Sequence, residues 1–474
     1  MRKLSHFINN VFLPENSDHY FELISPVNGQ AYALCPEAGP QEVDAAYHAA
    51  QQAFRLWKKT TPAARQKALL LLADAIAQHA DQIIELQSQE TGQLKHFIRQ
   101  EEIVASCDTV RFFAGAARCQ EGKASAEYIS GFNSVIRREP LGVVGQVTPW
   151  NYPFMMAIWK IAPALAAGNT LVLKPGDTTP LSTLLLAEIA APFFPEGCIN
   201  VVLGKAATGA LVVSSPQASL VSITGSVRAG LQVAASAAAN LTRAHLELGG
   251  KAPAIVFADA DIPKAASTLC AAGFFNAGQD CTAATRLIVQ HSIYPQFLEA
   301  VLSEIRQLRY GLPDDTGAFY GALNSKQQLE QVKGFIERLP AHATIEAGGK
   351  AADSDGFYFE PTLISGLHQQ DEAIQREVFG PVMTIQSFGT ADEALSMAND
   401  VDFGLAASVW TKDHRRAHQI SNDLDFGTVW INNHIPLCAE MPHGGFKKSG
   451  YGKDLSAYSL EEYTRIKHVM SDIS

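Results

Sequence analysis

Apolar residues recur at helical spacing through the first quarter of the chain. In "EVDAAYHAAQQAFRLWKKT" the apolar positions spaced three and four residues apart are Val43, Ala46, Tyr47, Ala50, Phe54 and Trp57. In the next stretch Thr61 suits an N-cap, Pro62 the first helical position, and Gly92 the stop. A third helix is expected over about Lys95–Cys119, ending near Gly122.

Beyond Gly142 the pattern changes to short apolar runs that alternate with helical segments. The first series is "GVVGQVTPW", "NTLVLKPG", "INVVLG", "LVSITGS", "RAHLELGG" and "APAIVFADAD". The second is "RLIVQ", "TIEAGG", "YFEPTLI", "VMTIQSF", "AASVWT" and "GTVWINN". Runs this apolar suit parallel strands that are covered on both faces. The alternation with helices predicts an α/β fold built from βαβ units, with a sheet of the nucleotide-binding type.

Length and charge narrow the class of protein. A chain of 474 residues is too long for one core and is expected to form two or three domains. Its net charge of −11 argues against nucleic acid or an anionic membrane as the main partner, because both require a basic surface. No apolar run approaches the roughly 18–20 residues of a membrane span, and the N-terminus lacks the apolar core of a secretory signal. Seven cysteines without a CxxC pair indicate reduced thiols in a cytoplasmic protein, with no metal site.

Cys281 stands out among these cysteines. It lies in "FNAGQDCTAATR", where small and polar residues give the thiol little steric cover. A nucleophilic cysteine needs such access and needs help in becoming a thiolate. A helix beginning near Cys281 would provide part of that help through its free N–H groups. Taken alone, however, an unpaired cysteine is more often a buried apolar residue.

Two other residues allow either a catalytic or a purely structural interpretation. Glu247 lies between leucines at the end of an expected strand, where apolar surroundings raise the pKa of a carboxylate toward that of a general base. Glu247 equally suits a structural role, in which its side chain caps a turn or pairs with Lys251. Asn151 follows a strand and precedes Pro153, so its amide could donate to an oxyanion or form an Asx turn.

Further polar residues follow the expected strands directly. Lys174 and Asp177 come after "LVL", at the strand end where open α/β sheets bind their ligands. Gly225 and Gly230 lie between a strand and a helix, an arrangement that suits a phosphate near a helix N-terminus. Glu377 in "EVFGP" precedes a further strand and has no distinguishing context of its own.

Together these segments resemble the aldehyde dehydrogenase superfamily over essentially the whole chain. The motifs that carry the resemblance stand in the family's order and at its approximate spacing: "PWNYP", "LKPGDTTP", "ITGS", "LELGGKAP", "FFNAGQDCT", "EVFGP" and "MPHGGFKKSGYGKD". Several independent motifs in register outweigh the structural interpretation of each single residue.

The resemblance implies a three-part architecture. We expect a Rossmann-like NAD-binding domain over 1–119 and 141–249, and an α/β catalytic domain over 250–447. An oligomerisation arm is expected over 120–140 and 460–474, built from a hairpin near Gly122–Glu139 and a strand near Tyr463–Met470. The implied assembly is a homodimer or homotetramer.

The family mechanism assigns a role to each catalytic residue. Cys281 attacks the aldehyde to give a thiohemiacetal, and the Asn151 amide and the Cys281 N–H hold the oxyanion. After hydride transfer, Glu247 activates water to hydrolyse the thioester. The glutamate favours release of a free acid over transfer to coenzyme A.

The resemblance also assigns a cofactor site. The expected NAD-binding residues are Thr148, Pro149, Trp150, Lys174, Asp177, Gly204, Gly225, Ser226, Leu248, Gly249, Glu377 and Phe379. A carboxylate at Asp177 accepts from a ribose hydroxyl but repels a 2′-phosphate, which favours NAD over NADP.

Within the family, segments such as "VRFFAGAARC" and "EEYTRIKHVM" resemble bacterial γ-aminobutyraldehyde dehydrogenases of putrescine breakdown. The expected substrate is therefore 4-aminobutanal, whose ammonium needs a carboxylate or an aromatic face. The candidate substrate-pocket residues are Tyr152, Met156, Trp159, Asp108, Asp280, Thr282 and His434. Betaine aldehyde, 3-aminopropionaldehyde and a broad range of aldehydes remain alternatives, as does a non-catalytic structural role.

Overall fold

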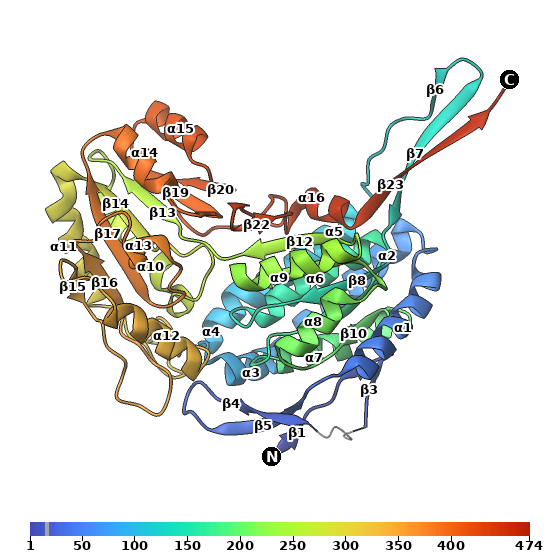
Figure 1. Ribbon diagram of the computed structural model, residues 1–474, viewed down its shortest axis with the longest axis horizontal. Coiled ribbons are helices and arrows are strands. Elements are labelled where there is room, and N and C mark those ends of the chain that lie inside the picture. The colour runs from blue at the N-terminus through green and yellow to red at the C-terminus, as the bar shows by residue number, and fades with distance from the viewer. Residues whose placement is uncertain (15–18) are drawn as a thin grey trace.

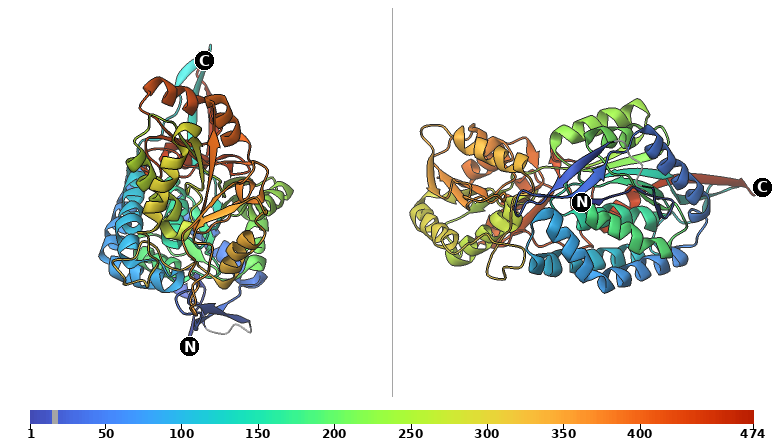
Figure 2. Two further views of the ribbon diagram at one scale, coloured as in Figure 1. Left: turned by 90° about the vertical axis from the view of Figure 1, so that its left-hand side faces the viewer. Right: turned by 90° about the horizontal axis from the view of Figure 1, so that it is seen from below.

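The computed structural model describes residues 1–14 and 19–474. It has an α/β fold with two lobes, and an arm that extends from the first of them (Figures 1 and 2). No helix among the described residues combines the length and the apolar character needed to cross a membrane.

The first lobe is built on an eight-stranded sheet in the order β22-β12-β11-β8-β9-β10-β2-β3. Its parallel centre consists of β8 (Val143–Val147), β9 (Thr170–Lys174), β10 (Ile199–Val201), β11 (Ala218–Gly225) and β12 (Arg243–Leu248). Antiparallel strands lie at its edges: β22 (Gly450–Tyr451), β2 (Phe7–Ile8) and β3 (Val11–Phe12). The chain leaves β8 toward β9 on one side and returns to β11 on the other. This makes the carboxyl ends of β8 and β11 the switch point at which such sheets bind ligands.

Both faces of this sheet are covered, because its strands carry apolar side chains on both sides. On β9, Leu171 and Leu173 belong to one core and Val172 to the opposite core. The first core is shared with α2 (Pro62–Gln78), α5 (Val104–Ala116), α6 (Pro153–Ala167) and α7 (Leu181–Ala190). The second is shared with α1 (Pro40–Trp57), α8 (Ala206–Ser214) and α9 (Val227–Ala239).

Two long helices expected from the sequence are interrupted. Thr61 caps α2 as predicted, but the helix ends at His79, and α3 (Ala80–Thr91) continues to Gly92 in a left-handed conformation. The region from Lys95 divides into α4 (Lys95–Phe97), the π-helical η1 (Ile98–Ile103) and α5. The π-turn directs Glu102 inward, where its carboxylate accepts a hydrogen bond from Gln87 at 2.7 Å.

The second lobe holds a seven-stranded sheet in the order β15-β16-β17-β14-β13-β19-β20. The strands are β13 (Pro253–Val256), β14 (Arg286–Gln290), β15 (Thr344–Ala347), β16 (Thr362–Ser365), β17 (Val382–Phe388), β19 (Ala406–Trp410) and β20 (Thr428–Ile431). One core is shared with α10 (Ile262–Phe274), α11 (Tyr294–Ile305), α12 (Lys326–Glu337) and α13 (Glu372–Gln375). The other is shared with α14 (Ala391–Asn399) and α15 (His414–Asp423).

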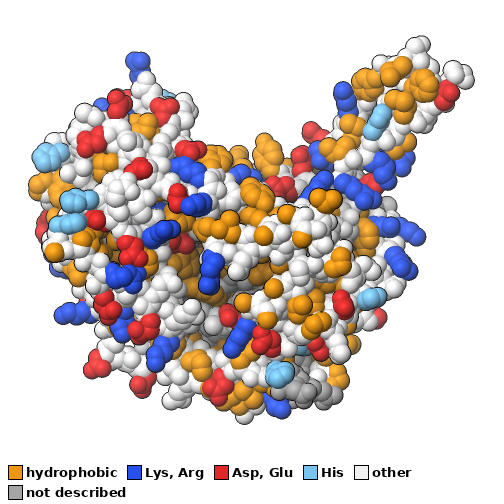
Figure 3. Space-filling model, in the orientation of Figure 1, with side chains coloured by type: hydrophobic (Ala, Val, Ile, Leu, Met, Phe, Trp, Pro, Cys, Tyr) orange, Lys and Arg blue, Asp and Glu red, His pale blue; other side chains and the backbone are white. Residues whose placement is uncertain are grey.

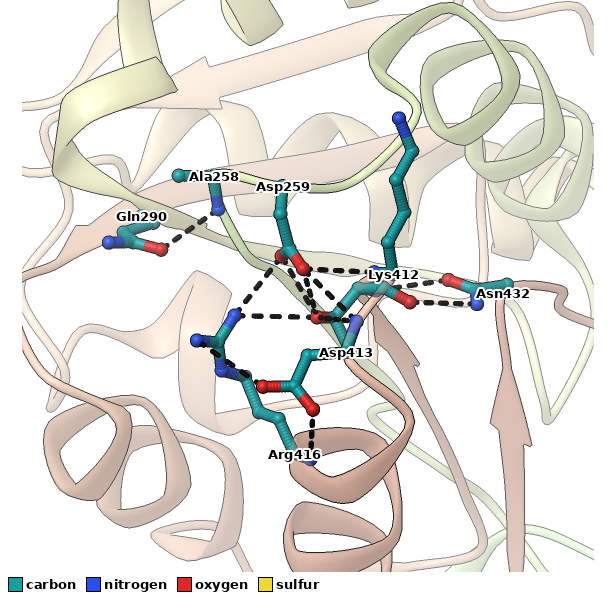
Figure 4. Close-up of polar contacts among 8 residues, drawn as sticks. Ala258, Asp259, Gln290, Lys412, Asp413, Arg416 and Asn432 are labelled. Carbon is teal, nitrogen blue, oxygen red and sulfur yellow. Dashed lines mark hydrogen bonds and ion pairs between the residues drawn. The ribbon is translucent and has the colours of Figure 1, made fainter.

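A polar cluster connects β13 to the start of α15 (Figure 4). The Asp259 carboxylate accepts hydrogen bonds from the Thr411 hydroxyl at 2.8 Å and from two backbone N–H groups, those of Lys412 and Asp413, at 3.1 Å. Arg416 Nη1 adds an ion pair at 3.1 Å.

The arm consists of β6 (Ala126–Ile129), β7 (Phe132–Pro140) and β23 (Thr464–Asp472). β23 pairs antiparallel with β7 along its whole length, from Thr464 opposite Pro140 to Asp472 opposite Phe132. Apolar side chains cover part of its surface (Figure 3). A three-stranded sheet of β1 (Arg2–Lys3), β5 (Ala31–Pro36) and β4 (Tyr20–Ile24) lies near the N-terminus. The remaining elements of the described residues are β18 (Phe403–Gly404), β21 (Phe446–Lys447), α16 (Ser456–Glu462) and the short helices η2 (Ala191–Phe193), η3 (Phe275–Gly278) and η4 (His291–Ile293).

Candidate active site

A cavity of about 370 Å³ lies between the two lobes. It is lined from the first lobe by segments that follow β8, β11 and β12, and from the second by the loop before β14 and the segment before β17. The cavity brings together the four residues Asn151, Glu247, Cys281 and Glu377, which lie far apart in the sequence.

Cys281 lies in the turn between η3 and β14, and the chain continues into a strand, so the N–H groups of a helix N-terminus do not assist its thiol. The loop is shaped instead by left-handed residues, Asn276 with φ 49° and Ala277 with φ 56°. The backbone packs closely here, because a Cβ on Gly250 would lie 2.1 Å from the Cys281 carbonyl oxygen. Burial raises the pKa of the Cys281 thiol well above its usual range, and the Asp280 carboxylate adds to this effect. A separate proton acceptor is therefore needed to form the thiolate.

The Asn151 side chain is fixed against the cysteine loop. Its Nδ2 donates to the Gln279 carbonyl at 3.0 Å, and its backbone carbonyl accepts from Asn276 Nδ2 at 2.9 Å and from Gln93 Nε2 at 3.0 Å. The amide nitrogen carries two hydrogens, so one remains for a ligand in the cavity.

Glu247 is the next-to-last residue of β12 and is buried, with 3% of its surface exposed. One carboxylate oxygen has no hydrogen-bond partner within the described structure, and the other lies 3.8 Å from His443 Nε2. Burial raises the pKa of Glu247 well above its usual value, and the nearby Asp454 charge raises it further. A buried carboxyl with a raised pKa can exchange a proton near neutral pH.

Sequence reasoning missed a buried charged group beside Glu247. Lys160 Nζ contacts Asp454 at 2.7 Å, and both side chains are almost completely buried. The His245 ring lies between two carboxylates: its Nε2 is 3.2 Å from Asp454 Oδ1, and its Nδ1 is 2.5 Å from Glu462 Oε2. The Glu462 side chain is about one-third exposed. The available signal was Lys160 itself, a single charge in the otherwise apolar helix "PFMMAIWKIAPALAA".

The part of the cavity toward α9 has the features of a dinucleotide site. Ser226 caps this 13-residue helix, so its first N–H groups face the carboxyl end of the sheet. Glu377 accepts from Gly250 N at 2.8 Å, and a Cβ on Gly249 would lie 2.2 Å from its carboxylate. Phe379, with φ 56°, packs edge-on against Trp150, with ring centroids 5.3 Å apart.

The expected cofactor residues divide into two groups. Those that line the cavity are Pro149, Trp150, Asp177, Gly225, Ser226, Leu248, Gly249, Glu377 and Phe379. Thr148, Lys174 and Gly204 lie outside its lining. The Thr148 hydroxyl is buried without a partner in the described structure. Burial lowers the pKa of Lys174, and the nearby Asp177 charge opposes this shift. Carboxylate acceptors for ribose hydroxyls, helix N–H donors for phosphates and closely packed glycines together fit a dinucleotide.

The opposite part of the cavity contains five of the seven expected substrate residues, Tyr152, Met156, Trp159, Asp280 and Thr282. Asp280 is held by two neighbours: its Oδ2 accepts from the Tyr152 hydroxyl at 2.7 Å, and its Oδ1 accepts from Thr282 N at 2.7 Å. Its position gives the cavity a fixed carboxylate next to Cys281.

Asp108 and His434 do not line the cavity, so their expected places are wrong. Asp108 is exposed on α5, because the buried face of this helix is formed by other residues, such as Cys107 and Val110. His434 lies behind the cysteine loop, with Nε2 2.8 Å from the Thr282 carbonyl and Nδ1 2.8 Å from Ser408 Oγ. Burial lowers the pKa of His434 to about 4, so its ring is neutral.

Comparison with known proteins gives one consistent family. The profile described as "Aldehyde dehydrogenase family" matches residues 12–469. The chain is 37% identical to a betaine aldehyde dehydrogenase of Bacillus subtilis, with 98% of this chain and 96% of that protein covered. It is also 37% identical to an acetaldehyde dehydrogenase of Pseudomonas aeruginosa, with 99% and 94% covered. A solved structure of a betaine aldehyde dehydrogenase from Staphylococcus aureus in complex with NAD⁺ matches with a TM-score of 0.96 and 35% identity, covering 99% of this chain and 95% of that one.

Proposed function

The chain belongs to the aldehyde dehydrogenase family, and from this premise we propose that it oxidises an ω-aminoaldehyde with NAD, with 4-aminobutanal as the preferred substrate. The observation that carries the substrate class is Asp280, a carboxylate in the cavity wall beside Cys281. The aromatic rings of Tyr152 and Trp159 line the same part of the cavity. A carboxylate with neighbouring aromatic faces is the environment that a substrate ammonium requires.

The charges around the cavity support a cationic substrate over an anionic one. Among the described lining residues, Arg228 is the only arginine or lysine, and it lies in the first turn of α9, beside Ser226 at the cofactor end. The substrate end therefore offers no Arg or Lys for a second carboxylate, as succinate semialdehyde would need.

The catalytic residues are assigned to successive steps. The Cys281 thiolate adds to the aldehyde carbon, and the thiohemiacetal oxyanion accepts hydrogen bonds from Asn151 Nδ2 and the Cys281 N–H. Each such donor contributes about 2.7–4 kcal/mol to the transition state. NAD, when bound, supplies the hydride acceptor. Glu247 then takes a proton from water, which attacks the thioester carbon and releases the acid and the Cys281 thiol.

The proposed cofactor roles are those that the family resemblance implies. Glu377 binds the nicotinamide ribose, Lys174 and Asp177 bind the adenosine ribose, and Ser226 with the α9 N-terminus binds the pyrophosphate. The predicted limits of 1–119 and 141–249 for the NAD-binding domain and 250–447 for the catalytic domain remain part of this proposal.

Betaine aldehyde is the main competing substrate, because relatives of that name match this chain along nearly its full length. An acetaldehyde enzyme matches at the same identity, so overall similarity does not select between them.

A panel of aldehydes ranked by kcat/KM tests the proposal, with 4-aminobutanal, 3-aminopropanal, betaine aldehyde and uncharged butanal, each with NAD and NADP. We expect 4-aminobutanal with NAD to rank first. Asp280→Asn should lower kcat/KM for 4-aminobutanal much more than for butanal, which lacks the ammonium. An equal loss for both aldehydes would show that Asp280 orders the loop and does not recognise charge.

A further inference from the structure

We propose that His342, His368 and Asp371 form a surface site for a transition-metal ion, with Zn²⁺ as the best-suited ion. One ligand atom from each residue lies within 4.8 Å of the others. The site is on the second lobe, at the end of the sheet near β15 and β16.

Strand pairing brings the three residues together. β15 and β16 are antiparallel, with Thr344 opposite Ser365. His342 lies just before the first of these residues and His368 just after the second, so the pairing places both histidines at the same end of the two strands. Gly366, with φ 74°, reinforces this, because a Cβ there would lie 2.6 Å from the His342 carbonyl oxygen.

Hydrogen bonds hold the ligand atoms in place. The His368 N–H donates to Asp371 Oδ2 at 2.7 Å, and the Asp371 N–H returns a bond to the His368 carbonyl at 3.1 Å. His342 Nε2 lies 2.8 Å from the same carboxylate oxygen. The imidazole rings of His342 and His368 are stacked, with centroids 4.1 Å apart and planes 24° apart.

The donor set favours a borderline metal. Two imidazoles and one carboxylate are typical ligands of Zn²⁺, whereas Mg²⁺ and Ca²⁺ prefer oxygen ligands alone. Donor atoms around tetrahedral Zn²⁺ lie about 2.0–2.2 Å from the metal. Both histidines are exposed, so rotation of their rings can close the present separation without moving the backbone. The neighbouring carboxylate of Glu372 is already held by Arg338, with two contacts of 2.9 Å, which leaves the fourth metal position to water.

The site lies next to a segment that leads into the candidate active site. Asp371 immediately precedes α13, and α13 leads through Arg376 to Glu377 in the cavity. A bound metal would join the loop before β15 to this segment and stabilise the folded lobe through its preferential binding to the folded state.

Titration of Zn²⁺ into the full-length protein, followed by calorimetry, tests the site. Thiols such as exposed Cys119 and Cys438 also bind Zn²⁺, so the informative quantity is the change in the number of equivalents bound. His368→Ala and Asp371→Asn should each lose one equivalent; Asn retains an acceptor oxygen for the loop. His414→Ala is the matched control, since the His414 ring packs edge-on against His418 on α15, with centroids 4.3 Å apart, outside the three-residue cluster. This variant should leave the equivalent unchanged.

A crystal grown with Zn²⁺ provides an independent measurement. Anomalous density between the two histidines and Asp371 is expected. The proposal is overturned if wild type and His368→Ala bind the same number of equivalents, or if the anomalous density lies only at cysteines.

Discussion

Burial raises the pKa of both Cys281 and Glu247, although the proposed chemistry uses each of them in its charged form. A proton must therefore leave this region during turnover. The buried pair of Lys160 and Asp454 beside Glu247 makes the local balance of charge sensitive to any substitution there. The sequence identified Cys281 and Glu247 through local motifs. It could not reveal that Lys160 and Asp454 meet, because they are 294 residues apart and only the folded chain joins them.

Cys281→Ala should abolish NADH production with every aldehyde, because the variant cannot form the thiohemiacetal from which hydride leaves. NADH absorbance under steady-state and single-turnover conditions measures this. Cys438→Ala, at an exposed thiol, is the control and should retain activity. Turnover by Cys281→Ala above the uncatalysed rate would remove the nucleophile assignment.

Glu247→Gln should slow thioester hydrolysis by about 10²–10⁴-fold, the usual contribution of a general base. An NADH burst followed by a slow steady state is the expected time course. Only the carboxylate form accepts a proton, so wild-type hydrolysis should accelerate as pH rises through the raised pKa of Glu247. The Gln variant should lack that limb of the pH profile, and an unchanged profile would exclude Glu247 as the base.

At the scale of elements, hydrophobic periodicity predicted where helices and strands lie, but not where they are interrupted. Thr61 and Gly92 mark an N-cap and a stop in the structure as expected. In η1, Glu102 accepts a hydrogen bond from Gln87, 15 residues earlier, and a local pattern carries no record of such a contact. Left-handed Asn276 and Ala277, which shape the loop before Cys281, are likewise stabilised by the tertiary fold, and no local pattern announces them.

Asp259→Ala should lower the free energy of unfolding by about 0.5–1.5 kcal/mol, because the backbone N–H groups of the exposed α15 entry exchange their carboxylate acceptor for water. Burial opposes ionisation, but hydrogen bonds from Thr411 and the Arg416 charge together hold the pKa of Asp259 below its usual value. The stabilisation is therefore present above the unfolded-state pKa and is lost as pH falls through the lower folded-state pKa.

Urea unfolding of wild type and Asp259→Ala at neutral and acidic pH measures this difference, which should shrink in acid. Asp108→Ala, at an exposed aspartate of α5, serves as the control and should change stability little. A difference that is constant across the pH range would mean that ionised Asp259 does not stabilise the contact.

At the scale of the whole molecule, the arm is the part whose composition is least suited to exposure on a monomer. Tyr128, Ile129, Ile466 and Met470 are all exposed on it. They line one hollow together with His468 and Val135, so they form a continuous patch. Exposed apolar patches of this kind mark surfaces that bind a partner. The resemblance to the family predicted the arm and its role in assembly, whereas the sequence alone showed only a tail beyond the last domain.

If the arm joins copies of this chain, as the resemblance predicts, Ile466→Asp together with Met470→Asp should shift the assembly toward smaller species, because two charges in the patch would have to be desolvated on assembly. Light scattering coupled to size-exclusion chromatography measures the mass over a range of concentrations. Ser471→Asp adds a charge to the same strand at the alternate, opposite-facing register, and should leave the mass unchanged. If the double variant keeps the wild-type mass at the lowest concentration, or if wild type is itself a monomer of 51.1 kDa, the arm does not hold copies of this chain together.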